Sequence, residues 1–339
     1  MKGAVFYKKN DLKVEEVEKR SPASYEITLK VEYCGVCGTD RHIFDGAEGA
    51  GYTPPKTVLG HEFSGVVVDV GEDVGDIAVG DRVCVDPNDM CGKCYYCKQG
   101  MGHFCENMIG IGTSVDGGFA EYCTVNSKQV YKIPDSLSFK AAAMAEPVAC
   151  CVHGMDLTHV AQGDTVLIIG GGTIGMIMLQ LAKIAGAAKL IMMEPVKAKR
   201  EMAKKLGANI TIDPANESID EILKDNSIKQ IDKAIECVGL VETMKTAIKY
   251  TGKGGTAMLF GLTDPDREMS IKPFEIFKNE ITVIASYINP YTQMRALNLL
   301  ASEAIDIESL ITDIVPLEKI NDVFTTDKYK SSGKILIRP

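Results

Sequence analysis

Short apolar runs separated by glycine turns make up most of the first half of the chain. Examples are "AVFY", "EITLKVEYC", "SGVVVDV", "DRVCV" and "FAEYCTV". Runs of this length, rich in β-branched and aromatic residues and bounded by turn residues, are typical of strands. The pattern therefore predicts a compact β-rich domain.

The pattern changes in the second half, where strand-like and helix-like segments alternate. In "DTVLIIGGGTIGMIMLQLAKIAGA" an apolar strand, a glycine turn and an amphipathic helix follow one another. The segments "KLIMMEP" and "VKAKREMAKKLGA" predict a second strand and a second helix, and the series continues with "ITIDP", "IDKAIECVG" and "GGTAMLFG". Strands that alternate with helices predict a parallel sheet with helical crossovers.

Two later segments set the expected domain boundaries. Near "SYINPYTQMRALNLLAS" the chain is expected to leave the parallel sheet, and the last strand, "GKILIRP", is suited to return to the first domain. We predict an α/β protein with a β-rich domain over residues 1–150 and 289–339 and a doubly wound parallel-sheet domain over residues 151–288. The length of 339 residues also favours two domains.

Composition and charge narrow the function classes. The net charge is −9 and no basic block is present, which argues against nucleic acid and anionic membranes as partners. The sequence has no long apolar run, and its start is charged throughout, so we expect a cytoplasmic protein without a membrane span or a secretory signal. Eleven cysteines in such a chain favour metal or thiol chemistry over a disulfide scaffold.

The run "VLIIGGGTIGM" carries a dinucleotide-binding motif in its expected context. Its glycines are Gly170, Gly172 and Gly175, with Thr173 and Ile174 between the last two. The motif follows a predicted strand and opens a predicted helix, where glycines permit a tight turn and close approach of a pyrophosphate. The free N–H groups of the helix start would bind the phosphates.

The second predicted strand ends in an acid, Glu194, nineteen residues beyond Gly175. A carboxylate at this place hydrogen-bonds the adenosine ribose and repels a 2′-phosphate, so the sequence favours NAD over NADP. Lys199 and Arg200 lie close by in the sequence and are suited to an NADP phosphate, so the alternative cofactor stays open.

Four cysteines cluster in "CGKCYYCKQGMGHFC". The pattern C-x2-C-x2-C-x7-C can close a tetrahedral zinc site with no open position, which holds a loop and does no chemistry. An iron–sulfur cluster is the alternative, because clusters also take four cysteines. The cysteines of this predicted structural site are Cys91, Cys94, Cys97 and Cys105.

A second pair, Cys34 and Cys37, lies in "YCGVCGTDRH". The C-x-x-C spacing fits a redox dithiol or a pair of zinc ligands, and the pair alone does not decide between them. The dithiol interpretation needs both thiols at the start of one helix, whereas this pair ends a predicted strand.

Three features stand in order: "CGVCGTDRH", then "GHEFSG", then the four-cysteine segment followed by the dinucleotide motif. This order and spacing resemble the zinc-dependent medium-chain dehydrogenase/reductase family over essentially the whole chain. The resemblance implies a GroES-like catalytic domain built from both ends of the chain, with a Rossmann domain inserted between them. It also implies one catalytic and one structural zinc ion.

Ligands of the catalytic zinc follow from the resemblance. It implies that Cys37 and His61 bind the metal and that Glu62 is either a ligand or an exchangeable partner. Cys34 is then a buried strand residue. The segment "AAAMAEPVAC" matches the Glu-Pro segment of the family's polyol dehydrogenases and assigns Glu146 to the metal site, directly or through a water.

Two cysteines just after Glu146 offer another ligand. Cys150 and Cys151 are near in sequence, and a cysteine ligand there is the alternative to Glu146. Both lie in an apolar segment, which favours the core for them.

Proton transfer and the substrate pocket are also assigned by the resemblance. Thr39 and His42 occupy the places where the family keeps its proton relay, and Phe119 falls in a loop that lines the family's substrate pocket. The backbone of Ser286 and Tyr287 would lie near the nicotinamide.

The activity that the resemblance implies is zinc- and NAD-dependent hydride transfer from a secondary alcohol of a polyol, which gives a ketose. Sorbitol, xylitol, ribitol and arabinitol fit, as do their phosphorylated versions. L-Threonine 3-dehydrogenase and 2,3-butanediol dehydrogenase are the alternatives within this class. A non-catalytic NAD(P)H-binding protein is the alternative outside it. We expect a homo-oligomer, either a dimer or a tetramer.

Overall fold

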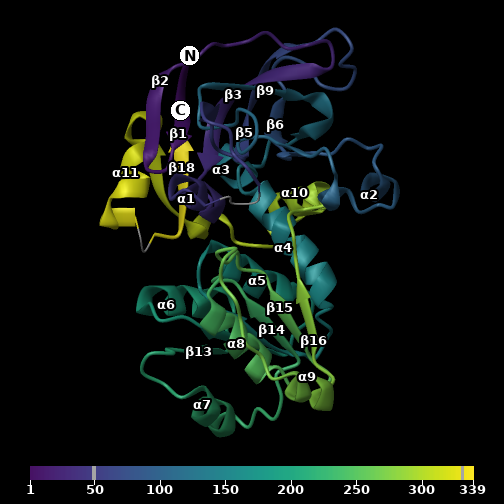
Figure 1. The fold of residues 1–339 in the computed structure, drawn as a ribbon, viewed down its shortest axis with the longest axis vertical. Coiled ribbons are helices and arrows are strands. Elements are labelled where there is room, and N and C mark those ends of the chain that lie inside the picture. The colour runs from purple at the N-terminus through teal and green to yellow at the C-terminus, as the bar shows by residue number, and fades with distance from the viewer. Residues whose placement is uncertain (48–50, 330–331) are drawn as a thin grey trace. The chain divides into compact units, whose positions relative to one another are not determined.

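Both ends of the chain build the first of two structural units. The computed structural model describes residues 1–47, 51–329 and 332–339 (Figure 1). The first unit comprises Met1–Ala149 and Asn289–Pro339, and the second comprises Cys150–Ile288. Within the described residues, no helix is both long and apolar enough to cross a membrane.

Mostly antiparallel strands form the first unit. They are β1 (Lys2–Lys8), β2 (Asp11–Glu16), β3 (Glu26–Gly35), β4 (Thr57–Val58), β5 (Glu62–Val70), β6 (Arg82–Val85), β7 (Asn88–Asp89), β8 (Ile109–Gly110), β9 (Tyr122–Asn126), β10 (Val130–Lys132), β17 (Ile311–Pro316) and β18 (Lys334–Arg338). A seven-stranded sheet has the order β10-β6-β5-β3-β18-β17, with β9 also paired to β3. The other sheets are β2-β1-β4 and the hairpin β7-β8.

The last strand confirms the predicted return of the chain to the first domain. In β18, Leu336 and Ile337 pair antiparallel with Gly35 and Cys34 of β3. Buried side chains from both ends of the chain share one core, as Ile337 does with Leu29. The helices of this unit are α1 (Gly38–Phe44), α2 (Tyr95–Lys98), α3 (Phe139–Ala142), α10 (Gln293–Ala301) and α11 (Ile320–Thr325), and α4 (Ala145–Thr158) crosses the boundary.

A single parallel sheet forms the second unit, as the alternating pattern predicts. Its strands are β11 (Thr165–Ile169), β12 (Lys189–Met193), β13 (Ile210–Ile212), β14 (Lys233–Glu236), β15 (Thr256–Leu259) and β16 (Thr282–Ala285). The order β13-β12-β11-β14-β15-β16 is the six-stranded doubly wound order of dinucleotide-binding folds. In such sheets ligands bind beyond the carboxyl ends of the strands where the order reverses, here between β11 and β14.

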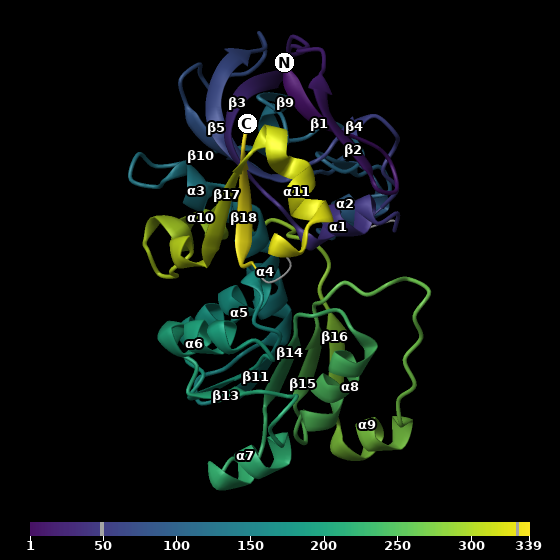
Figure 2. The ribbon, with the colours of Figure 1, turned by 90° about the vertical axis from the view of Figure 1, so that its left-hand side faces the viewer.

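Helices flank this sheet (Figure 2). They are α5 (Thr173–Ile184), α6 (Lys197–Leu206), α7 (Ile219–Asp225), α8 (Val241–Tyr250) and α9 (Pro273–Asn279). The apolar run of β11 is buried almost throughout, as expected for a strand that is covered on both faces. Helix α6 is followed by its C-cap residue Gly207, which has a φ of 119°, a left-handed conformation that favours glycine.

Candidate active site

The first metal-ligand group begins where β3 ends. Cys37 is the N-cap residue of α1, and its backbone N–H donates a hydrogen bond of 2.8 Å to Asp40 Oδ2. This capping-box arrangement fixes the turn between strand and helix. It places the Cys37 thiol at a defined point just beyond the strand, whereas Cys34 is fully buried within β3.

Neighbouring strands bring Cys37, His61 and Glu62 together. The start of β5 pairs with the end of β3, so that Glu62 lies opposite Gly35. One ligand atom from each of the three residues lies within 4.8 Å of the other two. A sulfur, a nitrogen and an oxygen atom at this spacing fit a zinc ion with room for a further ligand.

Asp40 backs the imidazole of His61. Asp40 Oδ1 lies 3.5 Å from His61 Nδ1, both side chains are buried, and neither atom has a hydrogen-bond partner among the described residues. Burial lowers the pKa of His61, but the Asp40 carboxylate and the Cys37 thiol together raise it well above its ordinary value. A carboxylate behind a metal-binding histidine orients the ring and leaves Nε2 as the ligand atom.

A lysine from the far end of the chain backs Glu62. Lys334 of β18 and Glu62 form an ion pair, and 5% and 2% of their side chains are exposed. A Cβ atom at position 35 would collide with the Glu62 carboxylate and the Lys334 side chain, so Gly35 makes room for the pair. Burial lowers the pKa of Lys334, but Glu62, Cys37 and Glu146 together raise it.

Glu146 lies in the first turn of α4 and is buried. Its carboxylate is close enough to Lys334 to raise the pKa of the ammonium group. It is not one of the three residues whose ligand atoms lie within 4.8 Å, so its direct or water-mediated role at the metal stays a prediction. Among the described residues, Cys150 and Cys151 belong to neither metal-ligand group.

The predicted relay residues lie in α1, the helix that Cys37 caps. Thr39 and His42 are both half-buried there. Phe119, in contrast, has no exposed surface and packs beside Gly60 in the core. Its aromatic ring fills the interior next to the start of β5, and the prediction that its loop lines the substrate pocket stays a prediction.

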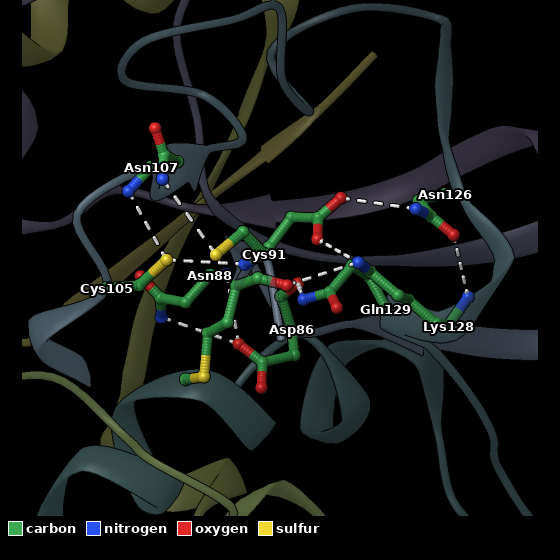
Figure 3. A network of polar contacts seen from close by, with 10 residues as sticks. Asp86, Asn88, Cys91, Cys105, Asn107, Asn126, Lys128 and Gln129 are labelled. Atoms are coloured by element: carbon green, nitrogen blue, oxygen red, sulfur yellow. Dashed lines mark hydrogen bonds and ion pairs between the residues drawn. The ribbon is translucent and has the colours of Figure 1, made fainter. Parts of the chain in front are cut away.

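The second metal-ligand group is the four-cysteine lobe, which is the segment 91–105. All four ligand atoms of Cys91, Cys94, Cys97 and Cys105 lie within 4.8 Å of one another. The backbone N–H groups of Cys91 and Asn107 donate to the Cys105 sulfur at 3.3 and 3.4 Å (Figure 3). Backbone hydrogen bonds also lower the pKa of Cys91 to about 6. Thiols that favour the thiolate form are suited to a metal.

The nucleotide loop lies at the carboxyl end of β11. Gly170 has a φ of 100°, and Gly172 is the N-cap of α5 with open space where a Cβ would stand. A Cβ at Gly175 would collide with the Gly170 carbonyl oxygen, so helix and strand approach this closely only with glycine. The loop, including Thr173 and Ile174 in the first turn of α5, fits a pyrophosphate.

Glu194 lies just beyond β12, next to this loop. Its carboxylate accepts hydrogen bonds from the backbone N–H groups of Gly171 and Val196 at 2.7 and 2.8 Å. Arg200 donates to the Glu194 carbonyl oxygen at 2.8 Å and pairs with Asp213 at 3.0 Å, while Lys199 is half-buried on α6. Two hydrogen bonds therefore fix the Glu194 carboxylate, and Arg200 is bound to the Glu194 carbonyl group and to Asp213.

Ser286 and Tyr287 directly follow β16, the last strand of the parallel sheet. Ser286 is half-buried, and its hydroxyl oxygen has no partner among the described residues. Their predicted place near the nicotinamide stays a prediction.

Comparison with known families and proteins identifies relatives over almost the whole chain. Residues 23–135 match the alcohol dehydrogenase GroES-like domain, and residues 173–302 match the zinc-binding dehydrogenase domain. A D-arabitol-phosphate dehydrogenase of Enterococcus avium is 36% identical over 92% of this chain and 89% of its own. A sorbitol dehydrogenase of Bacillus subtilis is 32% identical over 95% of this chain and 92% of its own.

A solved structure extends the likeness to the fold. A zinc-binding dehydrogenase from Sinorhizobium meliloti, crystallised with NADP, superposes with a TM-score of 0.95 at 38% identity, covering 100% of this chain and 99% of that one. The relatives, the two matched domains and the two metal-ligand groups lead to one assignment. The chain is an oxidoreductase of the zinc-dependent medium-chain dehydrogenase/reductase family and belongs to its polyol dehydrogenase-like branch.

Proposed function

We propose that this enzyme oxidises a secondary alcohol of a polyol to a ketose, with zinc at Cys37, His61 and Glu62 and with NAD as hydride acceptor. The observation that carries the proposal is the three-residue group itself, backed on one side by Asp40 and on the other by Lys334. Buried charged groups are costly to desolvate, so their concentration around three ligand atoms supports a functional site.

Zinc in this group would supply Lewis-acid polarisation of the alcohol oxygen. The protein's own side chains prepare the group for it. Asp40 holds the His61 ring in one orientation, and the positive charge of Lys334 balances the buried carboxylate of Glu62. Glu146 adds a second buried carboxylate near Lys334, and the resemblance to polyol dehydrogenases implies that it belongs to the metal site, directly or through a water.

A proton must leave the alcohol when it is oxidised. Thr39 lies two residues beyond Cys37 on α1, and its hydroxyl is suited to accept the alcohol hydrogen bond. His42 lies further along the same short helix and is half-buried, so its imidazole can take up a proton on the inner side and release it to solvent.

Glu194 is the feature that favours NAD over NADP. Two backbone N–H groups fix its carboxylate at the end of β12, so the negative charge stays where a 2′-phosphate would bind. The relative from Sinorhizobium meliloti was crystallised with NADP, so the two cofactors must be compared directly. We expect NAD to be used with the higher kcat/KM.

We also propose a homo-oligomer that forms through the edge of the parallel sheet. Strand β16 is one of the two edge strands of this sheet, and Val283 within it is exposed. Nearby in the sequence, 65% of Phe274 and 79% of Phe277 of α9 are exposed. An edge with unpaired backbone groups and apolar neighbours is suited to a second copy, which light scattering after gel filtration would detect.

Initial rates of NADH formation test the proposed activity. The panel contains sorbitol, xylitol, ribitol, both arabinitols, arabinitol phosphates, L-threonine, 2,3-butanediol and ethanol, each with NAD and with NADP. Cys37→Ser serves as the blank for contaminating dehydrogenases. We expect one polyol or polyol phosphate to be oxidised much faster than threonine, butanediol and ethanol. Threonine or butanediol as the only good substrate would contradict the polyol assignment.

A further inference from the structure

A buried polar cluster lies at the neck of the four-cysteine lobe. The neck is the hairpin of β7 and β8, in which Asn88 pairs with Gly110 and Asp89 with Ile109. Asp86 lies just before it and is 5% exposed. Asp86 Oδ1 accepts hydrogen bonds from the backbone N–H and the side-chain amide of Asn88, at 3.1 and 3.4 Å (Figure 3).

Asn289 completes this cluster from the other end of the sequence. It is fully buried and is the first residue of the first unit after the chain leaves the parallel sheet. Its amide nitrogen donates to Asp86 Oδ1 at 3.2 Å, and its amide oxygen accepts from Asn88 at 2.6 Å. Asn289 also donates to the buried side chain of Gln293 at 3.4 Å. Asp86 therefore binds the amide nitrogen of Asn289, and Asn88 binds its amide oxygen.

The backbone around Asn289 is strained. Ile288 has a φ of 45° and Tyr291 a φ of 58°, and a left-handed conformation is costly for a β-branched residue. Such a conformation persists only where the surrounding contacts over-determine it. The cluster of Asp86, Asn88 and Asn289 supplies contacts of this kind between the two strained residues.

The turn also contacts the four-cysteine lobe at a second place, through Tyr291. A Cβ at Gly102, which lies between Cys97 and Cys105, would collide with the Tyr291 hydroxyl oxygen and with Met90. The turn 288–291 therefore rests on the lobe at two places, its neck and Gly102. In the sequence, this turn comes directly after Ser286 and Tyr287.

We propose that Asp86 is a positioning residue, which clamps Asn289 through its own carboxylate and Asn88 and so fixes the strained turn 288–291 against the four-cysteine lobe. The clamp also limits the motion of Ser286 and Tyr287, which directly precede this turn. That these two lie near the nicotinamide rests on the proposed function, whereas the clamp itself does not.

The neck offers a matched control. Asp89 is a second acid, three residues after Asp86 and within β7, but it pairs with Lys128 at 2.6 Å and accepts from Asn126 at 3.3 Å. Both partners lie in the segment 126–128, away from Asn289 in the sequence. Asp89→Ala thus removes a carboxylate from the same hairpin without removing a contact of the turn.

Hydrogen exchange of the full-length, zinc-loaded protein tests the clamp in peptides that cover residues 286–296. Asp86→Ala is expected to raise the exchange rate there by about tenfold or more, because the acceptor is lost. Asp86→Asn keeps one oxygen acceptor and is expected to give a smaller increase. Asp89→Ala is expected to leave this segment at the wild-type rate. Zinc content is measured in each variant, so that metal loss is recognised.

Equal exchange in Asp86→Ala and in the wild type would overturn the proposal, as would an equal increase in Asp89→Ala. If Asp86→Ala does not fold, Asn88→Ala replaces it, because it removes the side-chain hydrogen bonds to Asn289 and Asp86 and keeps the backbone one to Asp86. Unchanged exchange in that variant would overturn the proposal too. A rise in the KM for NAD with little change in kcat is expected for Asp86→Asn. Absence of any turnover in the wild type would contradict the proposed function, whereas the hydrogen-exchange result would still test the clamp.

Discussion

The two metal-ligand groups of the first unit stabilise charge by different means. In the first group, His61 and Glu62 are buried, and charged side chains stand behind them: Asp40 and Lys334. In the second, Cys97 lies in the short helix α2 and the other thiols lie in the segments around it, and the backbone N–H groups of Cys91 and Asn107 donate to the Cys105 sulfur. One group is embedded in the core and held by distant parts of the sequence, and the other is held by its own loop.

This difference indicates that the first group is suited to catalysis and the second to holding a loop in place. Four thiolates complete a tetrahedron and leave no position for a substrate, whereas three mixed ligands leave one. Buried charged partners tune a reacting site at a cost in folding free energy, which a purely structural site has no reason to bear. The comparison predicts that changes at the first group alter turnover and that changes at the second alter local order.

The largest effect is expected for Cys37→Ser. Loss of the metal removes several kcal/mol of transition-state stabilisation, which corresponds to a fall in kcat/KM of about 1,000-fold or more. NAD binding, measured by calorimetry, is expected to stay near the wild-type level because the glycine loop is untouched. Cys34→Ser is the matched control, and it is expected to keep its catalytic zinc and its turnover. Equal losses in both variants would contradict the ligand assignment.

Lys334→Met tests the buried ion pair. Removal of one partner leaves the Glu62 carboxylate uncompensated, so the free energy of unfolding is expected to fall by about 3–5 kcal/mol. Replacement of both partners, in Glu62→Gln with Lys334→Met, is expected to recover most of that stability but not the turnover. Denaturant unfolding of the two single variants and the double variant measures the coupling. Additive losses would show that the pair does not act as a unit.

A pH-dependent effect is expected at Asp86. Burial is the main reason that the pKa of Asp86 rises from 3.8 to about 6, although its amide hydrogen bonds oppose the shift. Because the folded chain binds this proton more tightly, the contribution of Asp86 to stability is fully present below pH 3.8 and is lost as the pH rises through about 6. The loss is about 3 kcal/mol.

Asp86→Asn removes this titration. We therefore subtract the unfolding free energy of Asp86→Asn from that of the wild type and expect this difference to fall between pH 4.5 and pH 7.5. The subtraction removes the contribution of other titrating groups, which both proteins share. A difference that does not change with pH would mean that Asp86 titrates near its ordinary value when folded.

Asp40→Asn is expected to have the smallest of these effects. The amide keeps an oxygen near His61 but loses the negative charge, and changes behind a metal ligand typically cost 10–100-fold in metal affinity or activity. Competition with a chromogenic chelator measures zinc affinity at the first group. Asp89→Asn is the control and should leave this affinity unchanged. Wild-type zinc affinity in Asp40→Asn would show that the Asp40 carboxylate does not contribute to metal binding.

Much of this architecture was predictable from the sequence. Local patterns carry their own evidence, so the parallel sheet, the glycine loop and the spacing of the four cysteines were predicted from the residues. The family resemblance added Cys37, His61 and Glu62, which the structure brings together. Their approach depends on the pairing of β3 with β5, a long-range contact that the residues alone do not reveal.

Other features lay outside the reach of sequence reasoning. The sequence contains a signal for the capping role of Asp40, because an acid three residues after an N-cap is a capping pattern. Its contact with His61 depends on the tertiary structure and has no such signal. Lys334 had none, since a lone lysine before an apolar strand is typical of the surface, and only the return of β18 beside β3 buries it.

The most direct test of the account counts zinc and measures turnover in three proteins: wild type, Cys37→Ser and Cys97→Ser. We predict two zinc ions per chain in the wild type and one in each variant. We also predict polyol oxidation with NAD by Cys97→Ser but not by Cys37→Ser. Turnover in Cys37→Ser, or its complete loss in a folded Cys97→Ser that retains one zinc ion, would contradict the division between a reacting site and a supporting one.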